Sequence, residues 1–166
     1  MTHSRARIHE LLGGDLAPRR DLGQNFVADP NTVRKIAALA EVGPGDCVVE
    51  IGAGLGSLTV ALAETGAHVT AIEVDHGLVP VLREVVRELP NVRVVEADAT
   101  AVEWDALLAG HDRWTLVANL PYNIATPLVA DLLDDVPAIT SMLVMVQKEA
   151  AQRFAAGPGS PSPCSC

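Results

Sequence analysis

Aromatic residues are scarce in this 166-residue sequence, where Phe, Trp and Tyr make up 3%, so a folded core must be built from Val, Leu, Ile and Ala. The three cysteines, Cys47, Cys164 and Cys166, are too few and too badly spaced for a disulfide framework or a metal site. No apolar run reaches the ~18 residues of a membrane span, and no charged-then-apolar leader opens the chain. We therefore expect a soluble, cytoplasmic protein without metal or membrane contact.

Basic residues are also outnumbered. Twelve Lys and Arg against 21 Asp and Glu give a net charge of −9, which opposes the basic footprint that is typical of nucleic-acid binders. Half of the basic residues nevertheless lie in the first 35 positions: Arg5, Arg7, Arg19, Arg20, Arg34 and Lys35. This segment is either a solvated arm or a patch that contacts phosphates.

The rest of the composition is ordinary for a globular protein, with 49% hydrophobic and 20% charged residues, and the length suits one domain. Short apolar runs predict strands at residues 47–51, 68–72, 92–95, 114–118 and 139–146. Helical spacing and capping signals predict helices at residues 5–12, from Pro30 up to Gly43, and at 57–64, 78–89, 127–133 and 149–155. This alternation predicts an α/β fold with a mostly parallel sheet flanked by helices.

Four predicted strand ends carry a polar or glycine-rich signal, at Gly52, Glu73, Asp98 and Asn119. In parallel sheets, ligands bind at the carboxyl ends of the strands. We therefore expect these four positions to form one site.

The first signal is a glycine loop, Glu50-Ile51-Gly52-Ala53-Gly54-Leu55-Gly56, between a strand and a helix that Ser57 can cap. A dinucleotide fingerprint needs glycine at position 57, and the Walker Gly-Lys ending is absent. The remaining Glu-x-Gly-x-Gly-x-Gly form is typical of Rossmann-like proteins that bind S-adenosylmethionine, whose cationic sulfonium suits the acidic Glu50. The alternative is a glycine turn needed only for packing.

The next two signals are carboxylates. Glu73 at a strand end can accept two hydrogen bonds from ribose hydroxyls, and Asp98 can accept one from an adenine amine. The alternatives are a solvated strand end for Glu73 and a turn-forming residue for Asp98.

Asn119-Leu120-Pro121-Tyr122 follows the fourth strand and suits methyl transfer to an aromatic amine. The Asn119 side chain and a backbone carbonyl can accept both amine hydrogens, and Pro121 stiffens that backbone. Tyr122 can stack on a base that has been flipped out of its helix. The alternative is a Pro-Tyr turn that merely packs.

With these motifs in order, the chain resembles the ribosomal RNA adenine-N6 dimethyltransferases over residues 20–156. The motifs that carry the resemblance are Gln24-Asn25-Phe26, the glycine loop, Glu73, Asp98, the run from Asn119 to Thr126, and Gln147-Lys148-Glu149. The resemblance implies a Rossmann-like class I methyltransferase fold, S-adenosylmethionine as donor, and ribosomal RNA as partner. It favours the small-subunit branch, which dimethylates two adjacent adenines, over the large-subunit branch.

The resemblance also assigns site residues by position. The implied cofactor-contacting residues are Asn25, Val27, Gly52, Gly54, Glu73, Asp98 and Asn119. The implied catalytic residues around the adenine are Asn119, Pro121 and Tyr122, with Phe26 as a second stacking face.

Members of the family continue past the fifth strand with two more strands and a small helical domain, whereas this chain reads Gly159-Ser160-Pro161-Ser162. We therefore expect an incomplete methyltransferase domain over residues 1–156, with an arm at 1–28 and a disordered tail at 157–166. Two other functions stay open: a cofactor-binding but catalytically silent fragment, and an adenine-N6 methyltransferase acting on DNA.

Overall fold

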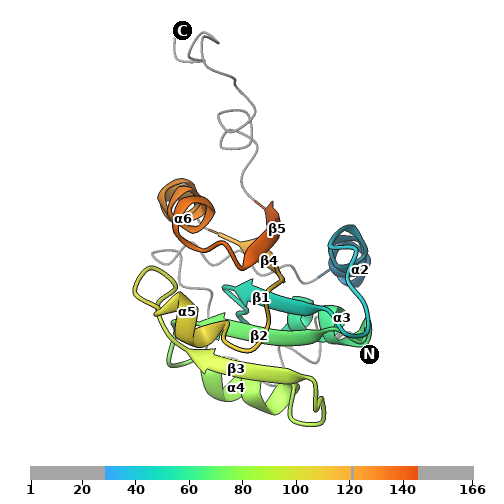
Figure 1. Ribbon diagram of the computed structural model, residues 1–166. Coiled ribbons are helices and arrows are strands. Elements are labelled where there is room, and N and C mark those ends of the chain that lie inside the picture. Colours follow the sequence, from blue (N-terminus) through green and yellow to red (C-terminus); the bar gives the residue numbers. More distant parts are fainter. Residues whose placement is uncertain (1–28, 121, 146–166) are drawn as a thin grey trace, which may run out of the picture.

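The protein contains a five-stranded parallel sheet, seen in a computed structural model that describes residues 29–120 and 122–145, without the side chains of Tyr122 and Asn123 (Figure 1). Its strands run in the order β3-β2-β1-β4-β5, and every neighbouring pair is parallel. The strands are β1 (Cys47–Ile51), β2 (His68–Glu73), β3 (Val92–Glu96), β4 (Trp114–Asn119) and β5 (Ile139–Met145). The α/β fold and all five strands predicted from the sequence are confirmed.

Helices cover both faces of the sheet (Figure 1). One face carries α2 (Pro30–Leu39), α3 (Ser57–Glu64) and α4 (Val79–Val85), and the other carries α5 (Trp104–Leu107) and α6 (Tyr122–Asp135). The central strand β1 is buried along its whole length, because alternate side chains point to the two layers. Val48 packs with α2 and α3, whereas Val49 belongs to the core that includes Leu128 and Leu132 of α6.

The helix boundaries differ from the sequence prediction in several places. The start of α2 is confirmed: the Asp29 side chain accepts a hydrogen bond from the Thr32 N–H at 2.8 Å, and Pro30 lies in the first turn. The helix ends at Leu39 rather than near Gly43. Helix α6 is longer than predicted because Pro127 lies inside it rather than at its beginning. Helix α4 ends at Val85 instead of position 89, and α5 was not predicted. The predicted elements at 5–12 and 149–155, the arm and the tail lie outside the described residues.

The N-terminus of α3 also corrects a prediction. Its N-cap is Gly56 rather than Ser57, and no side chain caps the helix. Gly56 has φ +82°, and a Cβ there would lie 2.8 Å from Cδ1 of Leu82 and 3.2 Å from Cγ1 of Val85. The third glycine of the loop is therefore required by the backbone conformation and by the close packing of α4.

One carboxylic acid is buried inside the sheet. Glu50 of β1 is 2% exposed, and its Oε2 accepts a hydrogen bond of 2.6 Å from the hydroxyl of Thr59 on α3. Burial raises the pKa of Glu50 to about 7; the Thr59 hydrogen bond opposes this shift, and the negative charge of Glu73 adds to it. Glu50 therefore titrates near neutral pH instead of near 4.5.

We predict that Gly56→Ala lowers the free energy of unfolding by roughly 2–4 kcal/mol, because left-handed backbone strain adds to a clash with Leu82. Gly45→Ala is the matched control, since Gly45 has φ +92° but nothing lies within 4 Å of its Cβ position. The control should cost only about 1–2 kcal/mol from strain. Urea denaturation of both variants measures the difference, and equal losses would show that packing against α4 does not matter.

We also predict that Glu50→Gln changes the pH dependence of stability. The folded-state pKa of about 7 lies above the ordinary value of 4.5, so in this window the native state holds a proton that the unfolded chain releases. The free energy of unfolding therefore falls as the pH rises from 4.5 to 7. Gln can still accept from Thr59, so at pH 8 the variant should be more stable than the wild type by roughly 1–3 kcal/mol.

Denaturant titrations from pH 5 to pH 8 measure this difference. Glu103→Gln is the control, because Glu103 is exposed and its side chain makes no capping bond. A difference between Glu50→Gln and the wild type that does not grow with pH would contradict the prediction.

Candidate functional site

The four predicted strand ends meet at one edge of the sheet, because all five strands are parallel. The chain fills the β2 and β3 side of β1 first and then crosses to β4 on the other side, so the topological switch point lies between β1 and β4. Gly52 follows β1 and Asn119 ends β4 at this point. A Cβ on Gly52, where φ is +77°, would lie 3.2 Å from the backbone oxygen of Asn119, so the glycine permits this close approach.

The glycine loop is tied to the end of β2. The N–H groups of Gly52 and Ala53 both donate to the backbone oxygen of Ile72, at 3.0 and 3.2 Å. The Gly54 N–H donates to Oε2 of Glu73 at 2.7 Å. These bonds fix the loop beside the carboxylate, so two of the sequence signals form one structure.

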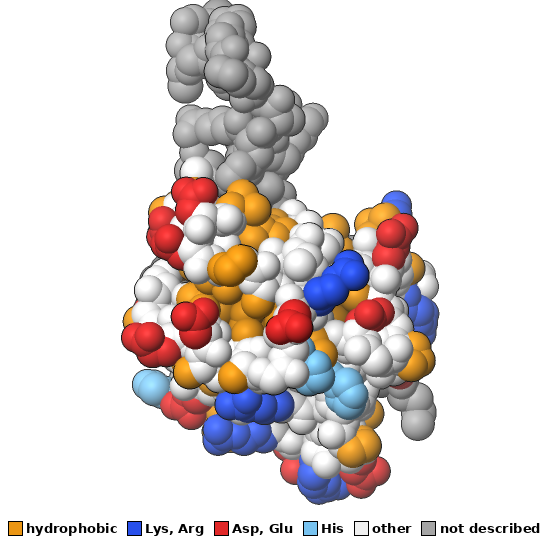
Figure 2. Space-filling model, viewed as in Figure 1, with side chains coloured by type: hydrophobic (Ala, Val, Ile, Leu, Met, Phe, Trp, Pro, Cys, Tyr) orange, Lys and Arg blue, Asp and Glu red, His pale blue; other side chains and the backbone are white. Residues whose placement is uncertain are grey.

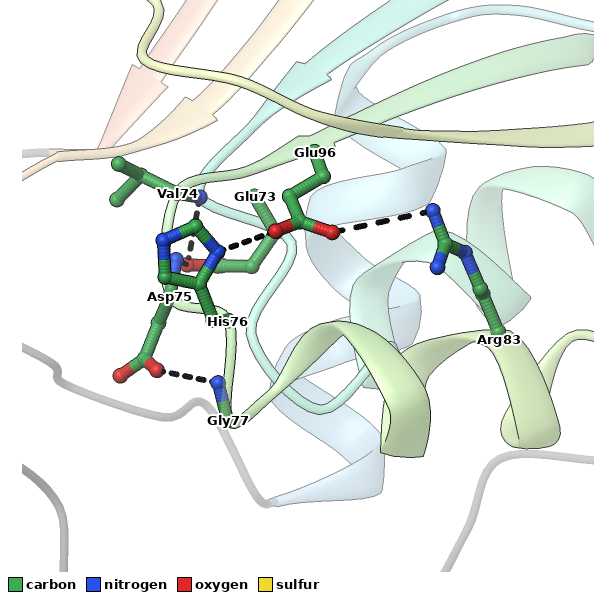
Figure 3. Close-up of polar contacts among 7 residues, drawn as sticks. All are labelled: Glu73, Val74, Asp75, His76, Gly77, Arg83 and Glu96. Carbon is green, nitrogen blue, oxygen red and sulfur yellow. Dashed lines mark hydrogen bonds and ion pairs between the residues drawn. The ribbon is translucent and has the colours of Figure 1, made fainter.

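Glu73 is 5% exposed and is not the solvated strand end of the alternative interpretation. Its Oε1 accepts from the N–H groups of Val74 and Asp75, at 3.0 and 2.9 Å (Figure 3). These bonds are additional to the one that its Oε2 accepts from Gly54. A carboxylate has about four acceptor positions, so these three bonds leave one, on Oε2. By this count Glu73 can accept one further hydrogen bond, whereas the sequence interpretation expected two from a ribose; the ribose contact itself stays a prediction.

Asp98 lies after β3 and is exposed. Its Oδ1 accepts from the N–H and the hydroxyl of Thr100, at 2.9 and 2.7 Å, and these bonds lower the pKa of Asp98 below its ordinary value. Asp98 is thus the turn-forming residue that the alternative predicted. A contact with an adenine amine stays a prediction, and the Asp98 carboxylate would have to make it from within this turn.

The remaining predicted residues are described only in part. Asn119 is half-buried, and Leu120 behind it is buried in the core. Tyr122 begins α6, directly after the end of β4, but its side chain is not described. Pro121 and the predicted N-terminal contacts lie outside the described residues; those contacts are Asn25, Phe26 and Val27.

A polar cluster that the sequence analysis missed lies beside Glu73. Nδ1 of His76 contacts Oε1 of Glu96, and the other Glu96 oxygen lies 4.0 Å from the guanidinium of Arg83 (Figure 3). Glu96 is the register partner of Glu73 at the end of β3. The signal in the sequence is Glu96 itself, an acidic residue that directly follows the strand predicted at 92–95. All three side chains are substantially exposed.

The surface charge of the described part is strongly acidic, since it holds six of the twelve basic residues but 17 of the 21 acidic ones. Figure 2 shows acidic, basic and apolar side chains interspersed on the face drawn. Within residues 29–120 and 122–145, no helix has the length and apolar character of a membrane span. In the same stretch, no three His, Cys, Asp or Glu side chains are grouped as metal ligands would be.

Comparison with known proteins finds clear relatives of this chain. Residues 16–166 of the sequence match the family model described as ribosomal RNA adenine dimethylase. The ribosomal RNA small subunit methyltransferase A of Corynebacterium jeikeium is 51% identical over 152 residues, which cover 88% of this chain and 48% of the relative. The protein of the same name from Streptomyces coelicolor is 49% identical over 161 residues, with coverages of 93% and 55%. The chain thus spans about half the length of these curated relatives.

Solved structures agree with the sequence match. A dimethyladenosine transferase from Plasmodium falciparum has a TM-score of 0.68 and 31% identity, over 80% of this chain and 46% of that one. The 23S rRNA methyltransferase ErmE has a TM-score of 0.66 and 33% identity, over 82% and 54% of the two chains. The fold is therefore that of class I methyltransferases, and the chain belongs to the ribosomal RNA adenine dimethylase family.

Proposed function

We propose that this chain carries the S-adenosylmethionine site and the catalytic motif of an enzyme that methylates N6 of adenine in ribosomal RNA. The target that we favour is a pair of adjacent adenines in the small subunit, each of which receives two methyl groups. The observation that carries this proposal is the meeting of Gly52, Glu73 and Asn119 at the switch point of the sheet, where the glycine loop is bonded to the Glu73 carboxylate.

The residues at this edge fit the proposed cofactor. Gly52 is exposed and has no Cβ, so a ligand can lie against its backbone. Glu73 keeps one acceptor position on Oε2 for a ribose hydroxyl, and neither this carboxylate nor that of Glu50 repels a cationic ligand. The Val74 side chain beside them is 51% exposed, so it can form an apolar contact with a ring.

The bound cofactor would supply an electrophilic methyl group on a sulfonium. For the acceptor, we propose that the Asn119 side-chain oxygen and the Pro121 carbonyl hold the two hydrogens of the adenine amine. Tyr122, with Phe26 as a second face, would stack on the base and exclude water. These groups orient the nitrogen lone pair for in-line transfer, so positioning rather than a general base provides the rate enhancement.

The choice of substrate is supported by the curated relatives, whose names place their activity on the small ribosomal subunit. ErmE, which is named for 23S rRNA, supports the large subunit as the second candidate. Ribosomes are cytoplasmic in bacteria, so we propose the same compartment for this chain. Basic residues in the first 35 positions would contact RNA phosphates, and such contacts weaken steeply with salt.

A methyl-transfer assay tests the proposal directly. The full chain is incubated with tritiated S-adenosylmethionine and purified small or large ribosomal subunits, and the RNA is then digested and analysed by mass spectrometry. We expect N6-methylated adenosines from the small subunit. Label in the large subunit only would favour the second candidate, and cofactor binding without transfer to either would favour the catalytically silent interpretation.

We predict that Glu73→Ala weakens S-adenosylmethionine binding by about 1–3 kcal/mol, because it removes a charge-assisted hydrogen bond and frees the loop at Gly54. Glu96→Ala is the matched control at the same register on the next strand. The control should bind nearly as well as the wild type in titration calorimetry. Equal losses in the two variants would mean that Glu73 has no special role.

We predict that Tyr122→Ala slows methyl transfer by ~10–100-fold, the equivalent of the 1–3 kcal/mol that base stacking provides. The melting temperature and the affinity for S-adenosylmethionine should stay close to those of the wild type. Tyr122→Phe should retain most of the activity, because the ring is kept. A melting temperature that falls together with the rate would identify Tyr122 as a packing residue.

A further inference from the structure

Two buried acidic side chains form hydrogen bonds to the glycine loop and to the helix that follows it. Glu73, 5% exposed, bonds to the middle of the loop at Gly54. Glu50, 2% exposed, bonds to Thr59, so this contact joins the strand before the loop to the helix after it. Among the described residues, no Lys, Arg or His forms an ion pair with either carboxylate. Neither of these two acidic groups is therefore neutralised by a cation of the described part of the chain.

The surroundings of Glu50 single it out as the group that responds to charge. Its register partners are Ala71 on β2 and Val117 on β4, both buried and apolar. Glu73 accepts three N–H bonds, whereas the described partner of Glu50 is one hydroxyl. A charge that is buried with so little compensation gains the most when a positive group arrives nearby.

The other titratable groups on the packed elements are remote or exposed. On β2 they are His68, at the opposite end of the strand, and Glu73 itself. Helix α3 has only Glu64, in its last turn, and α2 has Arg34 and Lys35, both exposed. Strand β4 has none. Among the described groups, Glu73 is thus the one whose charge acts on Glu50; burial is the main cause of the raised pKa of Glu50, about 7, and the charge of Glu73 adds to it.

We propose that Glu50 makes the cofactor site charge-selective, so that it favours the sulfonium of S-adenosylmethionine over the neutral thioether of the product. This inference rests on the proposed function. In methyl transfer, the carbon–sulfur bond breaks with its electron pair going to sulfur, a carbon–nitrogen bond forms, and the amine proton passes to water. The positive charge that Glu50 favours is then lost, so the reaction itself weakens binding of the spent cofactor and promotes its exchange.

Proton linkage gives this proposal a direct readout. Substrate and product cofactor differ in the methyl group and its charge, and the sulfonium also lowers the pKa of the α-ammonium group of its own molecule. The contribution of Glu50 is therefore the part of the pH dependence of their affinity ratio that is lost in Glu50→Gln. Binding of the cationic S-adenosylmethionine should lower the pKa of Glu50 and release a proton from it. Binding of the neutral product should release much less. For a decrease of one pKa unit from about 7, the affinity ratio should rise about fivefold between pH 6 and pH 8.

Titration calorimetry of the full chain with S-adenosylmethionine and S-adenosylhomocysteine at both pH values tests this. Repeating it in buffers of different ionisation enthalpy counts the protons released. In Glu50→Gln, which keeps an acceptor for Thr59, the fivefold rise of the ratio and the proton release that accompanies it should be lost. The exposed Glu103→Gln should behave like the wild type.

The outcomes separate the two proposals. Binding of neither ligand to the folded chain overturns the proposed function and this inference with it. Binding of both ligands, with the same pH dependence of the ratio in the wild type and in Glu50→Gln, overturns the role of Glu50 alone. Loss of the pH dependence in Glu50→Gln but not in Glu103→Gln supports it.

Discussion

The hydrogen bond from the Gly54 N–H to the Glu73 carboxylate is the contact on which the site depends. It joins the loop after β1 to the end of β2, and it places a buried charge directly under a backbone turn. Bonds from Gly52 and Ala53 to the Ile72 oxygen reinforce it. These backbone bonds to β2 fix the position of the loop, because the side chains of residues 52–56 have no hydrogen-bonding groups.

The sheet order converts this local contact into a site. Because the strand order reverses at β1, the ends of β1 and β4 lie at a topological switch point, where parallel sheets of this kind bind their ligands. The backbones of Gly52 and Asn119 approach closely there, which brings the glycine loop and the motif that begins at Asn119 together although they are 67 positions apart in the sequence. The parallel topology thus positions Asn119 at this edge of the sheet, and the hydrogen bond to Glu73 positions the loop there.

Much of this could be predicted from the sequence, because strand and loop signals are local. Five apolar runs, and the polar or glycine-rich signal after four of them, can be identified without coordinates, as can the start of α2 at Asp29 and Pro30. The errors arose where a long-range contact decides. Gly56 takes the cap position from Ser57 because Leu82 of a later helix packs against it, and Pro127 stays inside α6 because that helix is held by the core through Leu128 and Leu132.

The hydrogen-bond partners of the two buried acids, Glu50 and Glu73, also could not be predicted from the sequence. Glu50 and Glu73 read alike as acidic residues near strand ends, yet one is held by a single hydroxyl and the other by three backbone donors. Only the fold decides this, since the donors come from α3, from the loop and from the turn after β2.

The costly features of the described chain are concentrated at this same edge. The glycines at 52, 54 and 56 all have positive φ, and the two most deeply buried charged side chains lie directly beside them. The rest of the core is built from aliphatic side chains with ordinary hydrogen-bonded strands, which provide the stability that offsets such strain and desolvation. A fold optimised only for stability would place an apolar residue at Glu50, because its neighbours Ala71 and Val117 are apolar. The proposed function accounts for this unfavourable burial, since a positively charged cofactor would turn a destabilising charge into a favourable interaction.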